Sequence, residues 1–279
     1  MKPLSAFLLL FLFIFSACQS QPDKTKMLGR FNTDTDLLLA NFDCKTDVDD
    51  LHSAAALFTL MSHGEFAEVN HHVVAGTYGT QEGLYVPGEG LFELGFSGHW
   101  SDAHADFELA LNEVFSIVKP LLNAGGNVWI PEAGQSDFSA ALVRKVQSEL
   151  SNIETRKQIH IVQHSDWNEE VTTSNDLEFV KENTHYIKIA DGNVLDNGTP
   201  GFRSEAVVAW QNYVTTPALT QAWQMAYDLG KQYNGAEGRY ENGAVTRGGL
   251  DFSDHSEVAY IFGLEDLHDA NAFFQRFGH

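Results

Sequence analysis

The sequence has few cysteines and few basic residues. Only two of its 279 residues are cysteines, Cys18 and Cys44, and the chain is long enough for a buried core, so a small fold held together by disulfides is excluded. Asp and Glu number 38 against 17 Lys and Arg, which gives a formal net charge of −21. A field of that sign repels phosphate backbones, so we expect no nucleic-acid partner. The excess of acid fits a secreted protein or one that binds cations.

The N-terminus carries Lys2 and then an unbroken apolar run, residues 6–15. The run is too short to span a bilayer as a mature helix but fits the central region of a cleaved signal peptide. The next residues, Phe15-Ser16-Ala17-Cys18, resemble a bacterial lipobox. That resemblance implies a lipoprotein signal peptide over residues 1–17 and lipidation of Cys18.

Gln19 takes the place of the aspartate that is associated with retention in the inner membrane. The resemblance therefore implies a lipid anchor in the outer membrane and a cell-envelope protein that faces the periplasm or the exterior. An ordinary signal peptide with a chance cysteine is the alternative. Residues 18–35 are polar and lack apolar periodicity, so we predict that they form a tether and that a single domain spans residues 36–279.

Apolar runs of strand length alternate with helical patterns from Asp36 onward. The expected strands are residues 37–42, 73–78, 127–130, 158–162 and 185–189. The expected helices contain residues 51–58, 107–122 and 138–150, with Ser101 as the N-cap of the second and Gly125-Gly126 as its stop. This order predicts an α/β fold, a doubly wound and mostly parallel sheet flanked by helices, which binds ligands at the carboxyl ends of its strands.

Four carboxylates lie within eight residues directly after the first expected strand. They belong to Asp43, Asp47, Asp49 and Asp50, and they would repel one another unless a positive charge lies among them. A hard cation with oxygen ligands is the usual solution. The alternative is that Asp49 and Asp50 only stabilise the N-terminus of the following helix.

The run from Asn41 to Asp50 resembles the aspartate-rich loop of the nucleoside hydrolase superfamily, D-T-D-x-G-x-D-x-D-D in its longer form. Asn41 replaces an aspartate of that pattern and Lys45 replaces the glycine. A shorter register would place Lys45 on the catalytic aspartate instead. If the Lys45 ammonium pointed into the acids, it could neutralise them in place of a metal.

Two later segments match the same superfamily in the same order. The segment 127–140 resembles G-P-L-T-N, in which a main-chain carbonyl reaches the metal, and Asp137 falls on that position. The segment 249–254 resembles H-D-P-L-A, with Asp254 on the metal ligand and Ser253 where many members have a histidine acid. The residues Asp251-Phe252-Ser253-Asp254, together with Trp167-Asn168, are most similar to the nucleoside-hydrolase-like domain of proteins described as cellulose-binding.

The resemblance implies a calcium site and a hydrolytic reaction. The carboxylates of Asp43, Asp50 and Asp254 and the carbonyl of Asp137 would hold Ca²⁺, Asp43 would act as general base on water, and Asp47 or Asp49 would hold sugar hydroxyls. The implied activity is calcium-dependent hydrolysis of an N- or O-glycosidic bond in a nucleoside or glycan fragment. A non-catalytic glycan-binding lipoprotein is the alternative, and homo-oligomerisation stays open.

Further candidates follow the later strands. His164 and His255 are candidate acids for the leaving group, or buried histidines without a role in chemistry. The candidate sugar contacts are Trp167, Asn168, Glu169 and Asn193. Packing for Trp167, a helix N-terminus for Asn168 and Glu169, and an Asx turn for Asn193 are the competing interpretations.

Overall fold

The computed structural model describes residues 27–279. The expected signal peptide, the lipidated Cys18 and the first part of the expected tether lie outside the described residues. In the part of the chain that is described, no helix is both long enough and apolar enough to cross a membrane.

A six-stranded parallel sheet forms the centre of the molecule, in the order β5-β4-β3-β6-β7-β8. Its strands are β3 (Leu37–Phe42), β4 (His71–Ala75), β5 (Trp100–Asp102), β6 (Val128–Ala133), β7 (Ile159–Gln163) and β8 (His185–Lys188). Five of them match the strand predictions, but β5 was missed. Ser101, predicted as a helix N-cap, lies in β5, and the side chain of Asp106 caps the helix instead. Two short antiparallel pairs complete the strands, β1 (Met27–Leu28) with β2 (Phe31–Asn32) and β9 (Arg203–Ser204) with β10 (Leu250–Asp251).

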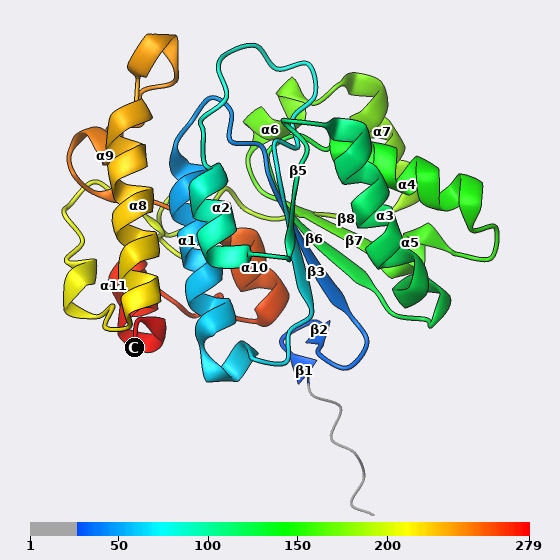
Figure 1. Ribbon diagram of the computed structural model, residues 1–279, viewed down its shortest axis with the longest axis horizontal. Helices are drawn as coiled ribbons and strands as arrows, with labels where there is room; N and C mark the ends of the chain where they lie inside the picture. Colours follow the sequence, from blue (N-terminus) through cyan, green and yellow to red (C-terminus); the bar gives the residue numbers. More distant parts are fainter. Residues whose placement is uncertain (1–26) are drawn as a thin grey trace, which may run out of the picture.

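Helices cover both faces of the sheet (Figure 1). One face carries α1 (Asp49–Ser62), α2 (Glu89–Phe96), α8 (Pro217–Tyr233), α10 (His255–Phe262) and α11 (Ala270–Phe277). The other carries α3 (Phe107–Asn123), α4 (Asp137–Glu149), α5 (Thr155–Gln158) and α7 (Ser174–Asn183). Two short helices, α6 (Asp166–Val171) and α9 (Gly243–Thr246), and the 3-10 turns η1 (Gly64–Phe66), η2 (Trp210–Asn212) and η3 (Ala236–Gly238) lie in connections.

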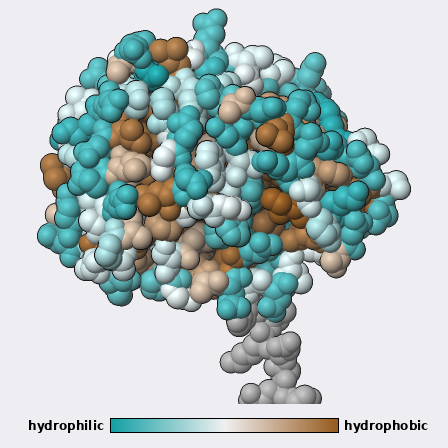
Figure 2. All heavy atoms as spheres, in the orientation of Figure 1, coloured by the Kyte–Doolittle hydropathy of each residue, from teal (hydrophilic) through white to brown (hydrophobic). Residues whose placement is uncertain are grey.

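Alternate residues of β3 belong to two separate cores. Leu38 and Phe42 pack with α1 and its neighbours, whereas Leu37 and Leu39 pack with α3 and α4. All six residues of the strand are buried, as expected for a parallel sheet that is covered on both sides. The doubly wound α/β prediction is therefore confirmed. On the side of the molecule that Figure 2 shows, exposed apolar side chains lie in small separate groups among hydrophilic ones.

The hairpin of β1 and β2 is part of the domain. Phe31 is fully buried, its ring centroid lies 5.5 Å from that of Phe262, and the Arg30 N–H donates to the Ile261 carbonyl at 2.8 Å. The tether predicted for residues 18–35 is therefore wrong for residues 27–35. The two strands are too short to produce a visible apolar period, so their packing could not be predicted.

The strand order creates a switch point between β3 and β6. The chain leaves β3 to build β4 and β5 on one side and later returns to build β6, β7 and β8 on the other. The loops that leave β3 and β6 therefore diverge and leave a crevice at the carboxyl ends of these strands, which is where open α/β sheets bind ligands.

Candidate functional site

A cavity of about 460 Å³ opens at this switch point. We call it the acid pocket, and its lining residues are Asp43, Lys45, Thr46, Asp47, Asp49, Asp50, Gln81, Ala133, Gly134, His164, Ser165, Trp167, Asn168, Asp191, Asn193, Arg203, Tyr240 and Asp254. The lining comes from the loops after β3, β4, β6, β7 and β8 and from the segment before α10. The sheet thus provides the rigid frame, and the loops provide the chemistry.

Five aspartates from two distant segments meet in the acid pocket. Asp43 directly follows β3, Asp47 lies in the loop, and Asp49 and Asp50 begin α1. Asp254, about 200 residues further along the chain, directly precedes α10. The structure therefore brings together the carboxylates that the sequence placed at one site.

Asp43 is held by three groups. Its Oδ1 accepts from the Lys45 N–H at 2.7 Å, its Oδ2 accepts from Nε2 of Gln135 at 2.6 Å, and it shares a hydrogen bond with the Asp50 carboxyl. Burial raises the pKa of Asp43 to about 6, although these hydrogen bonds lower it in part. Gly134 passes directly behind this side chain, with φ at +133° and room for no Cβ, since one would lie 2.5 Å from the Asp43 Cβ.

The neighbouring acids are destabilised in their charged forms. Burial and repulsion between the carboxylates raise the pKa values of Asp49 and Asp50 well above the usual range. The pKa of Asp254 rises to about 8, chiefly through burial. One oxygen of Asp50 accepts from the Cys44 N–H at 2.5 Å, whereas its Oδ1 is buried without a hydrogen-bond partner among the described residues. The pocket therefore lacks positive charge where its acids meet.

Asp47 belongs to a second acidic pair at the edge of the acid pocket. Nδ2 of Asn242 donates to both Asp47 oxygens at 3.2 Å and to Oδ2 of Asp251 at 2.8 Å. Burial and repulsion from Asp251 raise the pKa of Asp47 to about 7. Arg203 partly balances the pair, with its Nε 3.3 Å from Oδ2 of Asp251.

His164 is a buried cation in the wall of the pocket. Its Nε2 lies 3.6 Å from Oδ1 of Asp254, and its Nδ1 lies 3.3 Å from Oε1 of the fully buried Glu257. Burial alone would lower the pKa of His164, but the two carboxylates outweigh burial and raise it to about 9. The ring is therefore protonated at neutral pH and can donate a proton.

Lys45 does not neutralise the acids in the way the sequence suggested. Its ammonium lies over the ring of Tyr78, 4.1 Å from the centroid, and burial lowers its pKa. Among the ion pairs of residues 27–279, none joins Lys45 to an acid. Its backbone N–H, by contrast, contributes directly to holding Asp43.

The expected sugar contacts divide into two groups. Trp167, Asn168 and Asn193 line the acid pocket. Asn193 also takes part in the expected Asx turn, because its N–H donates to Oδ1 of Asp191 at 2.9 Å, while its contact with a sugar stays a prediction. Glu169 does not line the pocket: it accepts from the Tyr186 hydroxyl at 2.8 Å and pairs with Lys181 at 2.9 Å, which makes it a structural residue and corrects the prediction.

Two further predictions are wrong. Asp137 is the first residue of α4, so its carbonyl points along the helix, and its side chain accepts from the Thr173 N–H at 3.3 Å outside the acid pocket. His255 is 2% exposed and packs against Phe202 and Phe273, with ring centroids 5.9 and 5.4 Å away. Burial lowers its pKa to about 3, so it has no proton to give to a leaving group.

The structure adds residues that the sequence did not reveal. Gln135 contacts Asp43, Arg203 contacts Asp251, and Gln81 and the 53% exposed Tyr240 line the acid pocket. Gln135 lies two positions before Asp137 in the segment 127–140, and its side chain contacts Asp43 where that of Asp137 does not. Arg203 begins the two-residue strand β9 and Tyr240 lies in the short connection between η3 and α9, and nothing in the sequence marks them.

In residues 27–279, no group of three or more His, Cys, Asp or Glu side chains is arranged to hold a metal ion. Comparisons with models of known protein families, with curated proteins and with solved structures find no match.

Proposed function

We propose that this chain is a calcium-dependent hydrolase of N- or O-glycosidic bonds, with a fold similar to that of the nucleoside hydrolase superfamily and a lipid anchor at Cys18 in the cell envelope. The observation that carries the proposal is the convergence of Asp43, Asp49, Asp50 and Asp254 at the switch point of the sheet. Acids placed there for solubility would point into water and would not crowd one cavity.

The donor set of the acid pocket suits calcium. Asp43, Asp50 and Asp254 offer carboxylate oxygens, and Oδ1 of Asp50 is buried without a donor, as expected of an oxygen that awaits a cation. Calcium prefers oxygen ligands and tolerates irregular geometry, so a cation would relieve the same repulsion that now raises these pKa values. When bound, calcium would lower the pKa of water and orient sugar hydroxyls.

Asp43 is the proposed general base. With a pKa of about 6 it is ionised at neutral pH, and the Lys45 N–H and Gln135 fix its two oxygens in place. It would take a proton from the water that attacks the anomeric carbon as the glycosidic bond breaks through an oxocarbenium-like state. Asp49 and Asn193, which line the same cavity, are placed to accept and orient sugar hydroxyls.

His164 is the proposed acid. It lines the acid pocket, carries a proton at neutral pH, and is held in orientation by Glu257 and Asp254 on its two ring nitrogens. Proton donation to the leaving group from such a position contributes about 10²–10⁴-fold in typical enzymes.

A non-catalytic glycan-binding protein is the second candidate. Ser253 occupies the position where the resemblance expects a histidine acid, and its hydroxyl donates to Oδ1 of Asp251 at 2.8 Å. It is fully buried and engaged in the fold, so it cannot protonate a leaving group. If His164 does not take over this role, the same pocket binds a sugar without cleaving it.

Hydrolysis assays with the purified domain separate the two candidates. The substrates are p-nitrophenyl ribosides, natural nucleosides and oligosaccharides, each with calcium and with a chelator. Turnover that requires calcium and is lost in Asp43→Ala supports the hydrolase. Binding without turnover supports the second candidate. If the protein neither binds nor cleaves any of these compounds, both candidates are rejected.

A further inference from the structure

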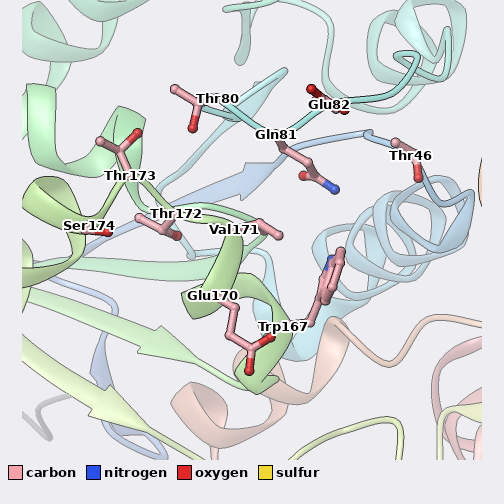
Figure 3. Close-up of a pocket in the computed structure, with 10 residues that line it drawn as sticks. All are labelled: Thr46, Thr80, Gln81, Glu82, Trp167, Glu170, Val171, Thr172, Thr173 and Ser174. Atoms are coloured by element: carbon pink, nitrogen blue, oxygen red, sulfur yellow. The ribbon is translucent and has the colours of Figure 1, made fainter.

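A second hollow adjoins the acid pocket beside α6 and has a volume of about 620 Å³. We call it the threonine groove, and its lining residues are Thr46, Thr80, Gln81, Glu82, Trp167, Glu170, Val171, Thr172, Thr173 and Ser174 (Figure 3). Thr46, Gln81 and Trp167 line both hollows. A ligand in the acid pocket can therefore extend past these three side chains into the groove without crossing a wall.

The lining of the groove suits a neutral, hydroxyl-rich ligand. It contains five hydroxyl side chains and one amide but no Lys, Arg or His, so an anionic group such as a phosphate has no cation to bind. Its two charged residues are acids, and Figure 3 shows that Glu170 points away from the other labelled side chains. The composition therefore favours a neutral ligand with many hydroxyl groups, whose hydrogen bonds with water can be replaced by hydrogen bonds with the protein.

Two of the hydroxyls that line the groove are engaged in hydrogen bonds of the fold, and two others, within residues 27–279, are free. Thr172 donates to the Asn168 carbonyl at 2.6 Å, and Thr173 is bound to Asp137. The hydroxyls of Thr80 and Ser174 have no hydrogen bond within the described chain and are exposed in the groove. These two hydroxyls, which lie on the same side of the view in Figure 3 with Thr173 between them, are thus available to a ligand.

Trp167 gives the groove an apolar platform. It is 60% exposed, at the second residue of the short helix α6, and Figure 3 shows its ring rising toward Gln81 and Thr46. A sugar ring combines an apolar C–H face, which stacks on an aromatic ring, with hydroxyls at its edge. An aromatic surface beside free hydroxyls is complementary to both parts of a sugar.

Gln81 connects the two hollows chemically. Its Oε1 accepts from Nε2 of Gln135, and the same nitrogen donates to Oδ2 of Asp43 at 2.6 Å. The side chain that borders the groove is therefore two hydrogen bonds away from the proposed base. A ligand that bridges both hollows contacts a continuous polar chain.

We propose that the threonine groove is a second sugar subsite, so that the ligand of this protein is a saccharide of at least two units rather than a nucleoside. The inference rests on the proposed function, because one sugar unit occupies the acid pocket while the next stacks on Trp167. It deepens that function by naming the substrate class.

Isothermal titration calorimetry with sugars of increasing length tests the proposal. The probes are glucose with its α-1,4- and β-1,4-linked dimers and trimers, xylose with its β-1,4-linked dimer and trimer, and inosine, all in the presence of calcium. In the wild type we expect at least one dimer to bind tenfold or more tightly than its single sugar. In Thr80→Leu and Ser174→Leu this ratio should fall below threefold, whereas Ser151→Leu, on an exposed turn after α4, should retain it.

The outcomes separate this inference from the proposed function. If single sugars or inosine bind as tightly as every dimer and trimer, or if both groove variants retain the wild-type ratio, the second subsite is refuted while the acid pocket stands. If no probe binds and none is cleaved, the proposed function fails and the inference falls with it. Loss of binding to all probes in Asp43→Ala, by contrast, tests the acid pocket alone.

Discussion

Replacing Asp43 by Asn should stabilise the metal-free protein at alkaline pH while removing its proposed base. The Asp43 carboxylate is 8% exposed and lies beside Asp50, so its charge is costly when no cation is present. An asparagine keeps an oxygen for the Lys45 N–H. Gln135 can flip its amide and present Oε1, which now has no partner, to the new amide group, and Gln81, whose Oε1 now accepts from Gln135, flips its own amide in step. The substitution therefore removes the charge and retains the hydrogen bonds.

The magnitude follows from the raised pKa of Asp43, from 3.8 to about 6. Because the folded protein holds this proton more tightly than the unfolded chain does, the wild type loses stability as pH rises from about 4 through 6. One pKa unit corresponds to about 1.4 kcal/mol, and integration between pH 5 and pH 8 gives a loss of roughly 1.4 kcal/mol from this group. The variant lacks the group and avoids the loss.

Urea denaturation in a chelator at pH 5 and pH 8 measures this difference. The free energy of unfolding of Asp43→Asn minus that of the wild type should increase by roughly 1.4 kcal/mol between the two pH values. Asp34→Asn, which changes an exposed carboxylate outside the pocket, is the control and should show no such increase. A difference for Asp43→Asn that does not change with pH would refute the assigned burial of a charged Asp43.

Three further predictions concern the cation, the acid and the hairpin. Asp254→Asn should weaken calcium binding at least tenfold in calorimetry, with the exposed Asp266→Asn as control, and equal affinities would contradict the metal site. His164→Gln should lower kcat by roughly 10²–10⁴-fold and abolish the loss of activity above pH 9, because a protonated ring is needed; an unchanged alkaline limb would argue against this acid. Phe31→Ala should lower the free energy of unfolding by about 3–5 kcal/mol, and a change under 1 kcal/mol would return the hairpin to the tether.

The main elements of the fold were predictable because both faces of the sheet are covered. All six residues of Leu37–Phe42 and four of the five residues of Ile159–Gln163 are buried, so each strand has mostly apolar residues on both of its faces. Trp100–Asp102 has three residues and two polar side chains, and such an edge strand leaves no period to detect. Phe31 is the one fully buried side chain of the two strands of its hairpin, and a single apolar residue gives no periodic pattern from which a strand can be predicted.

The candidate site was predictable only where residues near one another in the sequence also act together. Asp43, Asp49 and Asp50 follow one strand, so the strand end places them at one edge of the sheet. Asp137 and His255 were misassigned because sequence spacing does not give side-chain direction: the first begins a helix, and the second faces the core one position after Asp254. A rotation of about 100° per residue separates a pocket residue from a core residue.

The charge of the acid pocket explains why the protein needs a proton or a cation at this site. Six aspartates line it against Lys45, Arg203 and His164, so the fully ionised cavity carries a charge of −3. Of the three basic groups, the Lys45 ammonium lies on Tyr78, Arg203 pairs with Asp251, and His164 lies between Asp254 and Glu257. No ion pair among residues 27–279 joins any of these groups to Asp43 or Asp50, and burial raises the pKa of Asp43 to about 6 and that of Asp50 well above its usual range. A divalent cation would compete with protons for these carboxylates and would do so more successfully as pH rises, so the proposed metal binding and the expected alkaline destabilisation would have the same origin.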